Sequence, residues 1–137
     1  MDLITNNKLK HCKTVAEYMY MHADERLVDK EDMYTLGLLH DIGYLFGKEG
    51  HNKSGGKHLR SQGYKYWCEV YFHGSVGIEY TSYELDLLNK ADMMVSKEGK
   101  LVGYDERLKD IKVRYGETSE QYLNAVIIVK DLKDRGV

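Results

Sequence analysis

Two histidines and two aspartates in this chain could together bind a divalent metal ion. His40 and Asp41 are adjacent and follow the apolar run LGLL, while His11 lies upstream and Asp92 downstream. Imidazole nitrogens and carboxylate oxygens suit Mn²⁺, Fe²⁺, Co²⁺ or Zn²⁺ better than Ca²⁺. Such an ion lowers the pKa of a bound water and neutralises charge on a phosphoryl oxygen, as phosphoester hydrolysis requires. We therefore predict a metal site with His40 and Asp41 as its catalytic residues.

The elements that must position these residues are predicted to be helices. The chain has no proline, and its apolar residues recur at spacings of three and four. A first helix begins near Leu9 and turns His11 toward the core. A second helix begins after Asp29, a good N-cap residue, and closes with the pair at His40 before Gly43.

The last predicted ligand lies on a helix that begins further along the chain. Thr81 and Glu84 resemble a capping box, and the helix that follows them turns Asp92 inward. Because a buried carboxylate requires a partner, a metal would satisfy the inward-facing acids and imidazoles together. Four more helices are predicted, over 51–62, 65–72, 105–114 and 120–133, the last introduced by Thr118. The segment 65–72 is aromatic and also compatible with a strand, but its spacing favours a helix.

The order of these residues resembles a known signature. His11, then LLHDIGY with His40 and Asp41, then NKADMM with Asp92, is similar to the H...HD...D pattern of the HD superfamily of metal-dependent phosphohydrolases. The resemblance implies an all-α fold, which we expect to be one HD-type bundle of about six to eight helices over residues 1–137. It also implies that His11, His40, Asp41 and Asp92 are metal ligands, with Asp41 bridging when two ions bind.

Two further histidines extend the resemblance to the dinuclear members of the superfamily. Those members add two histidines between the HD pair and the last aspartate, and this chain has His51 in HNKSGGKHL and His73 in YFHGS. The predicted cofactor is therefore one or two divalent ions, with Fe, Mn, Co, Ni, Zn and Mg not distinguished. His58 and His22 would lie about 10 and 16 Å along their helices from His51 and His11, too far for the same ion.

The predicted substrate is a small phosphorylated molecule, either a nucleotide or another phosphoester. Four residues near the metal ligands are predicted to bind it: Lys53, Lys57, Tyr44 and Lys90. Tyr44 lies three residues after Asp41 and could stack on a nucleobase. Arg107 and Arg114 share a helix face and could clamp an anion, although pairing with Asp110 or Asp105 explains them as well.

The resemblance leaves several activities open. Some dinuclear members split dinucleoside tetraphosphates, but the segment NKADMMVSKEGK departs from that branch. Some HD-fold proteins use two irons for oxygen-dependent cleavage, and a third alternative is a nucleotide-sensing module without catalysis. Phosphate release, oxygen uptake, or binding without turnover would distinguish these readings.

The composition of the chain predicts its cellular location and the kinds of partner that it binds. The net charge is -2 and the sequence pI is about 6.3, which predicts no standing nucleic-acid partner. Residues Met1 to Lys10 are polar, and no apolar run is long enough for a membrane. Cys12 and Cys68 lie outside any CxxC spacing and are predicted to be buried reduced thiols. We expect a cytoplasmic protein, with a homo-oligomer left open.

Overall fold

The computed structural model describes residues 6–46 and 50–137, and within them the chain forms seven α-helices and one short 3-10 helix. In chain order they are α1 (Asn6–His22), α2 (Lys30–Leu39), η1 (Ile42–Leu45), α3 (His51–Ser61), α4 (Trp67–Phe72), α5 (Tyr83–Met94), α6 (Tyr104–Tyr115) and α7 (Glu120–Asp134). The predicted all-α fold is confirmed, including the helical interpretation of the aromatic segment. Among the described residues, β pairing is limited to the isolated bridge between Val95 and Leu101.

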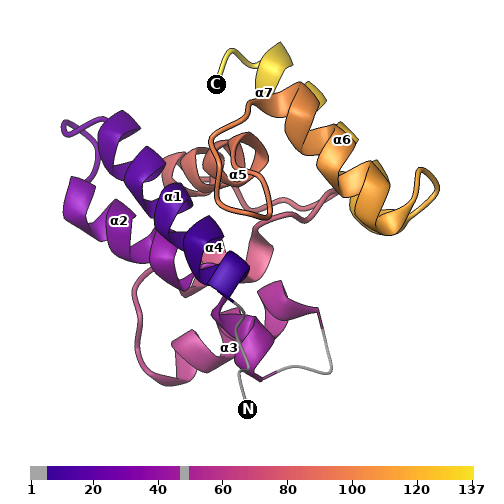
Figure 1. Cartoon of the computed structure of the whole chain (residues 1–137). Helices are drawn as coiled ribbons and strands as arrows, with labels where there is room; N and C mark the ends of the chain where they lie inside the picture. The colour runs from indigo at the N-terminus through magenta and orange to yellow at the C-terminus, as the bar shows by residue number, and fades with distance from the viewer. Residues whose placement is uncertain (1–5, 47–49) are drawn as a thin grey trace.

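Helix α5 separates two pairs of helices (Figure 1). Helices α1 and α2 pack against each other on one side of α5, and the hairpin of α6 and α7 packs on the other side. The approach of α1 and α2 depends on Gly37, because a Cβ atom there would lie 2.5 Å from the Cα atom of Ala16. Helices α3 and α4 pack together, and α3 also contacts η1.

The buried apolar residues form two clusters, one for each side of α5. The first cluster contains residues of helices α1 through α5, including Val15, Met19, Met33, Leu36, Val70 and Leu88. The second cluster joins the end of α5 to α6 and α7 and includes Met93, Ile111, Ala125, Ile128, Val129 and Leu132. Across the described part of the chain, no helix has both the length and the apolar character needed to cross a membrane.

The helix starts follow the predicted chemistry, with two corrections. Asp29 caps α2 as predicted, since its side chain accepts two backbone N–H bonds. Helix α5 is capped by Ser82 rather than Thr81, and α7 by Ser119 rather than Thr118. In each case the serine takes the extended conformation in which its oxygen reaches the first helical turn. Gly47 is one of the glycines that break up the sequence after the HD pair, and it lies outside the described residues.

Candidate metal centre

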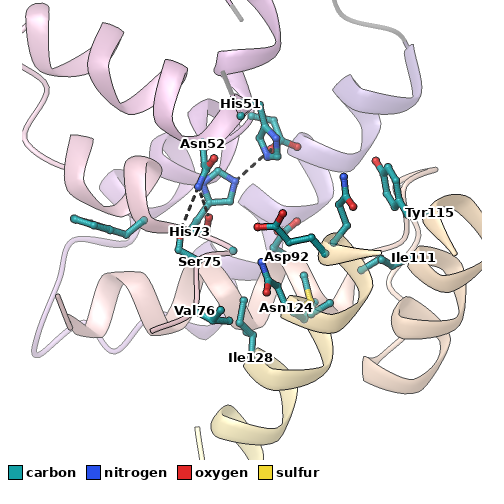
Figure 2. A pocket seen from close by; sticks show the side chains of 18 of the residues that line it. His51, Asn52, His73, Ser75, Val76, Asp92, Ile111, Tyr115, Asn124 and Ile128 are labelled. Carbon is teal, nitrogen blue, oxygen red and sulfur yellow. Dashed lines mark hydrogen bonds and ion pairs between the residues drawn. The ribbon is translucent and has the colours of Figure 1, made fainter. Parts of the chain in front are cut away.

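Six side chains from five helices meet at one place, and they are the six predicted metal ligands. We call them the metal cluster: His11 on α1, His40 at the end of α2, Asp41 next to it, His51 at the start of α3, His73 at the end of α4 and Asp92 on α5. Figure 2 shows His51, His73 and Asp92 around the hollow that the cluster faces. His11, His40, His73 and Asp92 are buried.

The carboxylate of Asp41 lies between two groups of imidazoles. Its Oδ2 atom is 3.3 Å from Nε2 of His40 and 3.8 Å from Nε2 of His11. Its Oδ1 atom is 3.2 Å from Nε2 of His51 and 3.5 Å from Nε2 of His73. Each oxygen of Asp41 therefore faces its own pair of histidines.

Asp92 completes the first of these groups. Its Oδ1 atom is 2.8 Å from Nε2 of His11 and 3.5 Å from Nε2 of His40. Donor atoms that surround one ion at about 2.0–2.2 Å lie about 3 Å from one another. The separations within both groups match that requirement.

The backbone fixes which nitrogen of each buried imidazole faces the carboxylates. The Nδ1 atoms of His11, His40 and His73 donate to the carbonyl oxygens of Ser96 (2.9 Å), Gly37 (2.6 Å) and Val70 (2.6 Å). Histidines that bind metals are commonly held in this way, with Nδ1–H on a carbonyl and the Nε2 lone pair free to coordinate. The three rings are thus prepared to offer Nε2 to a cation.

The unpaired polar atoms of the metal cluster show that a cation fits there. Within the part of the chain that the structure describes, the Nε2 atoms of His40 and His73 are buried and have no hydrogen-bond partner. With a proton on Nδ1, each Nε2 presents a lone pair toward carboxylate oxygens that are also acceptors. His11 meets an acceptor at both of its ring nitrogens. Buried polar atoms without partners are costly, and a divalent ion between the imidazoles and carboxylates would satisfy them together.

The charges of the cluster favour the same conclusion. Burial by itself raises the pKa of the Asp41 and Asp92 carboxyls, but the surrounding histidines hold the pKa of both well below 3.8. Burial likewise lowers the pKa of His40, but the neighbouring carboxylates of Asp41 and Asp92 together outweigh it and raise that pKa well above 6.5. His73 has a lowered pKa, because burial outweighs its contact with Asp41. The two carboxylates are therefore ionised and attract positive charge.

A close backbone approach brings His51 to the HD pair. A Cβ atom on Gly43 would lie 1.6 Å from the carbonyl oxygen of His51 and 2.8 Å from the backbone nitrogen of Gly55. Only glycine allows η1 to lie this close to the first turn of α3. Gly43, in the sequence IGY after the HD pair, thus places His51.

Comparison with known families agrees with this geometry. The family model for the HD domain matches residues 9–134 of the 137-residue chain. The chain belongs to the HD-domain family. No curated protein and no solved structure matches it. The HD superfamily consists largely of metal-dependent phosphohydrolases that bind divalent metals, and the clustered histidines and aspartates fit that chemistry.

The metal cluster of this HD domain opens into a cavity of about 800 Å³. Two of the predicted substrate-binding residues, Tyr44 and Lys53, line it. Lys57 and Lys90 are not among the described residues that line it, so their contact with substrate stays a prediction. Lys57 lies a full turn beyond Lys53 along α3, and Lys90 is two residues from Asp92, which turns it toward another side of α5.

The ring of Tyr44 has neighbours on both faces. It stacks on the imidazole of His51, with centroids 4.3 Å apart and planes 7° apart. Nζ of Lys8 lies 3.4 Å from the ring centroid, which requires the opposite face. A nucleobase could stack on Tyr44 only by displacing Lys8. The side chain instead supports His51.

The cavity also has a positively charged side that sequence reasoning found only in part. We call it the basic wall: Lys8, Lys97, Arg107 and Arg114. Arg107 and Arg114 both pair with Asp110, as the alternative to an anion clamp predicts. Lys8 was missed, although it lies one helical turn before His11 on the same face. Lys97 lies in a turn and offers no periodic signal.

The remaining histidines and cysteines lie away from the cavity lining. His22 donates to the carbonyl oxygen of Tyr18 and stacks on that ring, as a helix-end residue would. His58 stacks on Phe46. Cys12 is buried as predicted, but Cys68 is only partly buried, and both thiols are free.

Proposed function

We propose that this HD-domain protein is a metal-dependent phosphohydrolase that cleaves a nucleotide or another phosphoester with metal-activated water. One observation carries the proposal. The two oxygens of Asp41 face two separate donor groups, one with His11, His40 and Asp92 and the other with His51 and His73. This arrangement supports two ions held by a shared carboxylate.

When bound, divalent ions lower the pKa of coordinated water and neutralise developing charge on a phosphoryl group. The residues of the chain hold and orient this chemistry. Asp41 fixes the separation of the two donor groups, and the backbone carbonyls that accept from Nδ1 keep the imidazoles in place. Lys53, at the cavity edge beside His51, supplies positive charge for substrate oxygens.

Arg107 connects the metal cluster to the rest of the cavity. Its Nε atom donates to the backbone carbonyl oxygen of Asp92 at 3.0 Å, and its Nη2 atom is 3.7 Å from Oδ1 of the same residue. The guanidinium therefore fixes the part of α5 that carries Asp92. It also places a permanent positive charge beside the position proposed for the attacked phosphoryl group.

The experiment that tests the proposal combines metal analysis with a substrate panel. The purified protein is analysed for bound metals and then assayed for phosphate release from nucleotides and simple phosphoesters with each divalent ion. Asp41→Asn should lose bound metal and activity. Its matched control is Asp105→Asn, which removes the same charge from a side chain that is 94% exposed. Asp41→Asn with unchanged activity would refute the mechanism.

The same experiment separates the other readings. Bound iron with oxygen uptake and no phosphate release would favour an oxygen-dependent diiron enzyme. Nucleotide binding without turnover under any metal would favour a sensing module. We also propose a cytoplasmic location, since both cysteines are free thiols, and cell fractionation tests it.

A further inference from the structure

Positive charge gathers at the cavity in a chain that is slightly acidic overall. Among the described residues, five lysines and arginines line the cavity, against the three acids Asp41, Asp92 and Glu120. The chain as a whole has a net charge of -2. Two of the three acids belong to the metal cluster, where bound cations would neutralise them. The cavity of the loaded protein would therefore attract more than one negative group.

The basic wall is assembled around a single carboxylate. Asp110 on α6 accepts from Nη1 of Arg107 at 3.1 Å and from Nε of Arg114 at 3.3 Å. It also accepts from the backbone N–H of Lys97 at 3.1 Å. One negative charge thus orders three cationic residues from two segments, and their combined charge stays positive.

Lys8 brings a further cation to the same place from α1. Its ammonium group lies over the ring of Tyr44, which turns it toward the cavity. Burial lowers the pKa of Lys8, Asp41 raises it, and the nearby charges of Lys97 and Arg114 lower it again. Lys8 therefore lies close enough to Lys97 and Arg114 for their charges to act on it.

We propose that Lys8, Lys97 and Arg114 form a second anion subsite, which binds a phosphoryl group of the substrate other than the one attacked at the metal cluster. The inference rests on the proposed phosphohydrolase function, because that function defines which phosphoryl group is attacked. The substrate class is then a phosphoester with at least two phosphoryl groups. A cavity of about 800 Å³ lies within the usual range for ligands of nucleotide size.

The end of α6 and two histidines of the metal cluster lie on opposite sides of the hollow (Figure 2), as a substrate with two phosphoryl groups requires. Figure 2 shows Tyr115 and Ile111 of α6 on one side of the hollow and His51, Asn52 and His73 on the other, with Asp92 between them. Arg114 precedes Tyr115 in the last turn of α6 and lines the same cavity. One ligand can therefore contact the metal cluster and α6 together.

Calorimetric titration of the manganese-loaded protein tests the subsite. The ligands are AMP, with one phosphoryl group, and ADP and adenosine 3′,5′-bisphosphate, each with two. For a ligand that is hydrolysed, KM from a parallel phosphate assay replaces Kd. At least one ligand with two phosphoryl groups should bind about tenfold more tightly than AMP, as a charge-assisted contact predicts.

Three variants test which residues cause the preference for two phosphoryl groups. Arg114→Gln and Lys97→Gln should each remove most of it while leaving AMP binding within about twofold. Lys109→Gln removes the same charge from an exposed position on α6 outside the cavity and should keep the preference. Thermal unfolding of each variant checks that it is folded, and Lys97→Gln keeps the backbone contact to Asp110 if Arg114→Gln does not fold.

The outcomes distinguish the subsite from the proposed function. Equal binding of all three ligands by the wild type, or an equal loss in Lys109→Gln, would overturn the subsite. A preference that depends on Arg114, found without phosphate release from any compound, would keep the subsite and reject the phosphohydrolase. Phosphate release without any preference would reject the subsite alone.

Discussion

The metal cluster and the basic wall share one cavity but are held in different ways. In the metal cluster, three buried imidazoles are each anchored on a backbone carbonyl, and the side chain of Asp41 is only 13% exposed. In the basic wall, long side chains are ordered by one carboxylate, and the side chain of Arg114 is 31% exposed. Buried, anchored groups tolerate little displacement, whereas exposed cations adapt. Changes in the cluster should therefore have larger effects than changes in the wall.

The largest effect is expected from closing the gap between η1 and α3. Gly43→Ala places a Cβ atom 1.6 Å from the carbonyl oxygen of His51, a backbone atom that cannot rotate away. Overpacking of this kind costs about 1–3 kcal/mol or more. We expect a lower midpoint of thermal unfolding and loss of the metal held through His51, measured by calorimetry and elemental analysis.

The matched control for that change is Gly50→Ala. Among the described residues, a Cβ atom on Gly50 meets only the side-chain oxygen of Asn52, at 3.0 Å, which can shift. If Gly43→Ala were as stable as Gly50→Ala and kept its metal, the close approach would not be what positions His51.

The next largest effect shows whether the site binds one ion or two. His51→Ala removes the Nε2 atom that lies 3.2 Å from Oδ1 of Asp41, and should lower the metal content from two ions to one. Loss of an outer-shell partner lowers activity by about 10- to 100-fold. Loss of the ligand His51 should lower it further. His58→Ala, on the same helix but stacked on Phe46, should keep both ions. Full metal content in both His51→Ala and His73→Ala would exclude the dinuclear site.

The contrast between cluster and wall also explains what the sequence could predict. Histidines and acids on apolar helix faces break the expected pattern, so His11, His40 and Asp92 are visible without a structure. Lysines on helix surfaces follow the expected pattern, so Lys8 and Lys90 look alike until the structure places only Lys8 at the cavity. The helices were predicted from spacing, whereas the caps at Ser82 and Ser119 depend on local backbone angles that spacing does not specify.

Arg107 belongs to both regions and should give an intermediate effect. Arg107→Gln removes the positive charge and the bond from Nε to the carbonyl oxygen of Asp92. We expect metal affinity or activity to fall by about 10- to 100-fold. Chelator competition measures the manganese affinity, and the separate values of kcat and KM show whether catalysis or substrate binding is weakened.

A second substitution at that position separates charge from geometry. Arg107→Lys keeps the charge but cannot reach Asp92 and Asp110 with a planar fork. If the lysine variant restores the wild-type values, charge alone matters. If it behaves like Arg107→Gln, the residue acts by positioning Asp92.

The smallest effect is expected at Asp110, where the wall meets solvent. Burial raises the pKa of this carboxyl, but the N–H of Lys97 and the two arginines outweigh it and hold the pKa below 3.8. Because the folded pKa is depressed, ionised Asp110 stabilises the fold above about pH 4, and this contribution is lost as the pH falls through the lowered pKa. Asp110→Asn should cost about 1 kcal/mol at pH 7, or about 3–4 °C in the unfolding midpoint, and nothing near pH 2. Asp105→Asn, at a side chain that is 94% exposed, is the matched control. A deficit in Asp110→Asn that persisted unchanged at pH 2 would mean that the carboxylate charge does not order the wall, and that Arg107 and Arg114 are placed by helix packing alone.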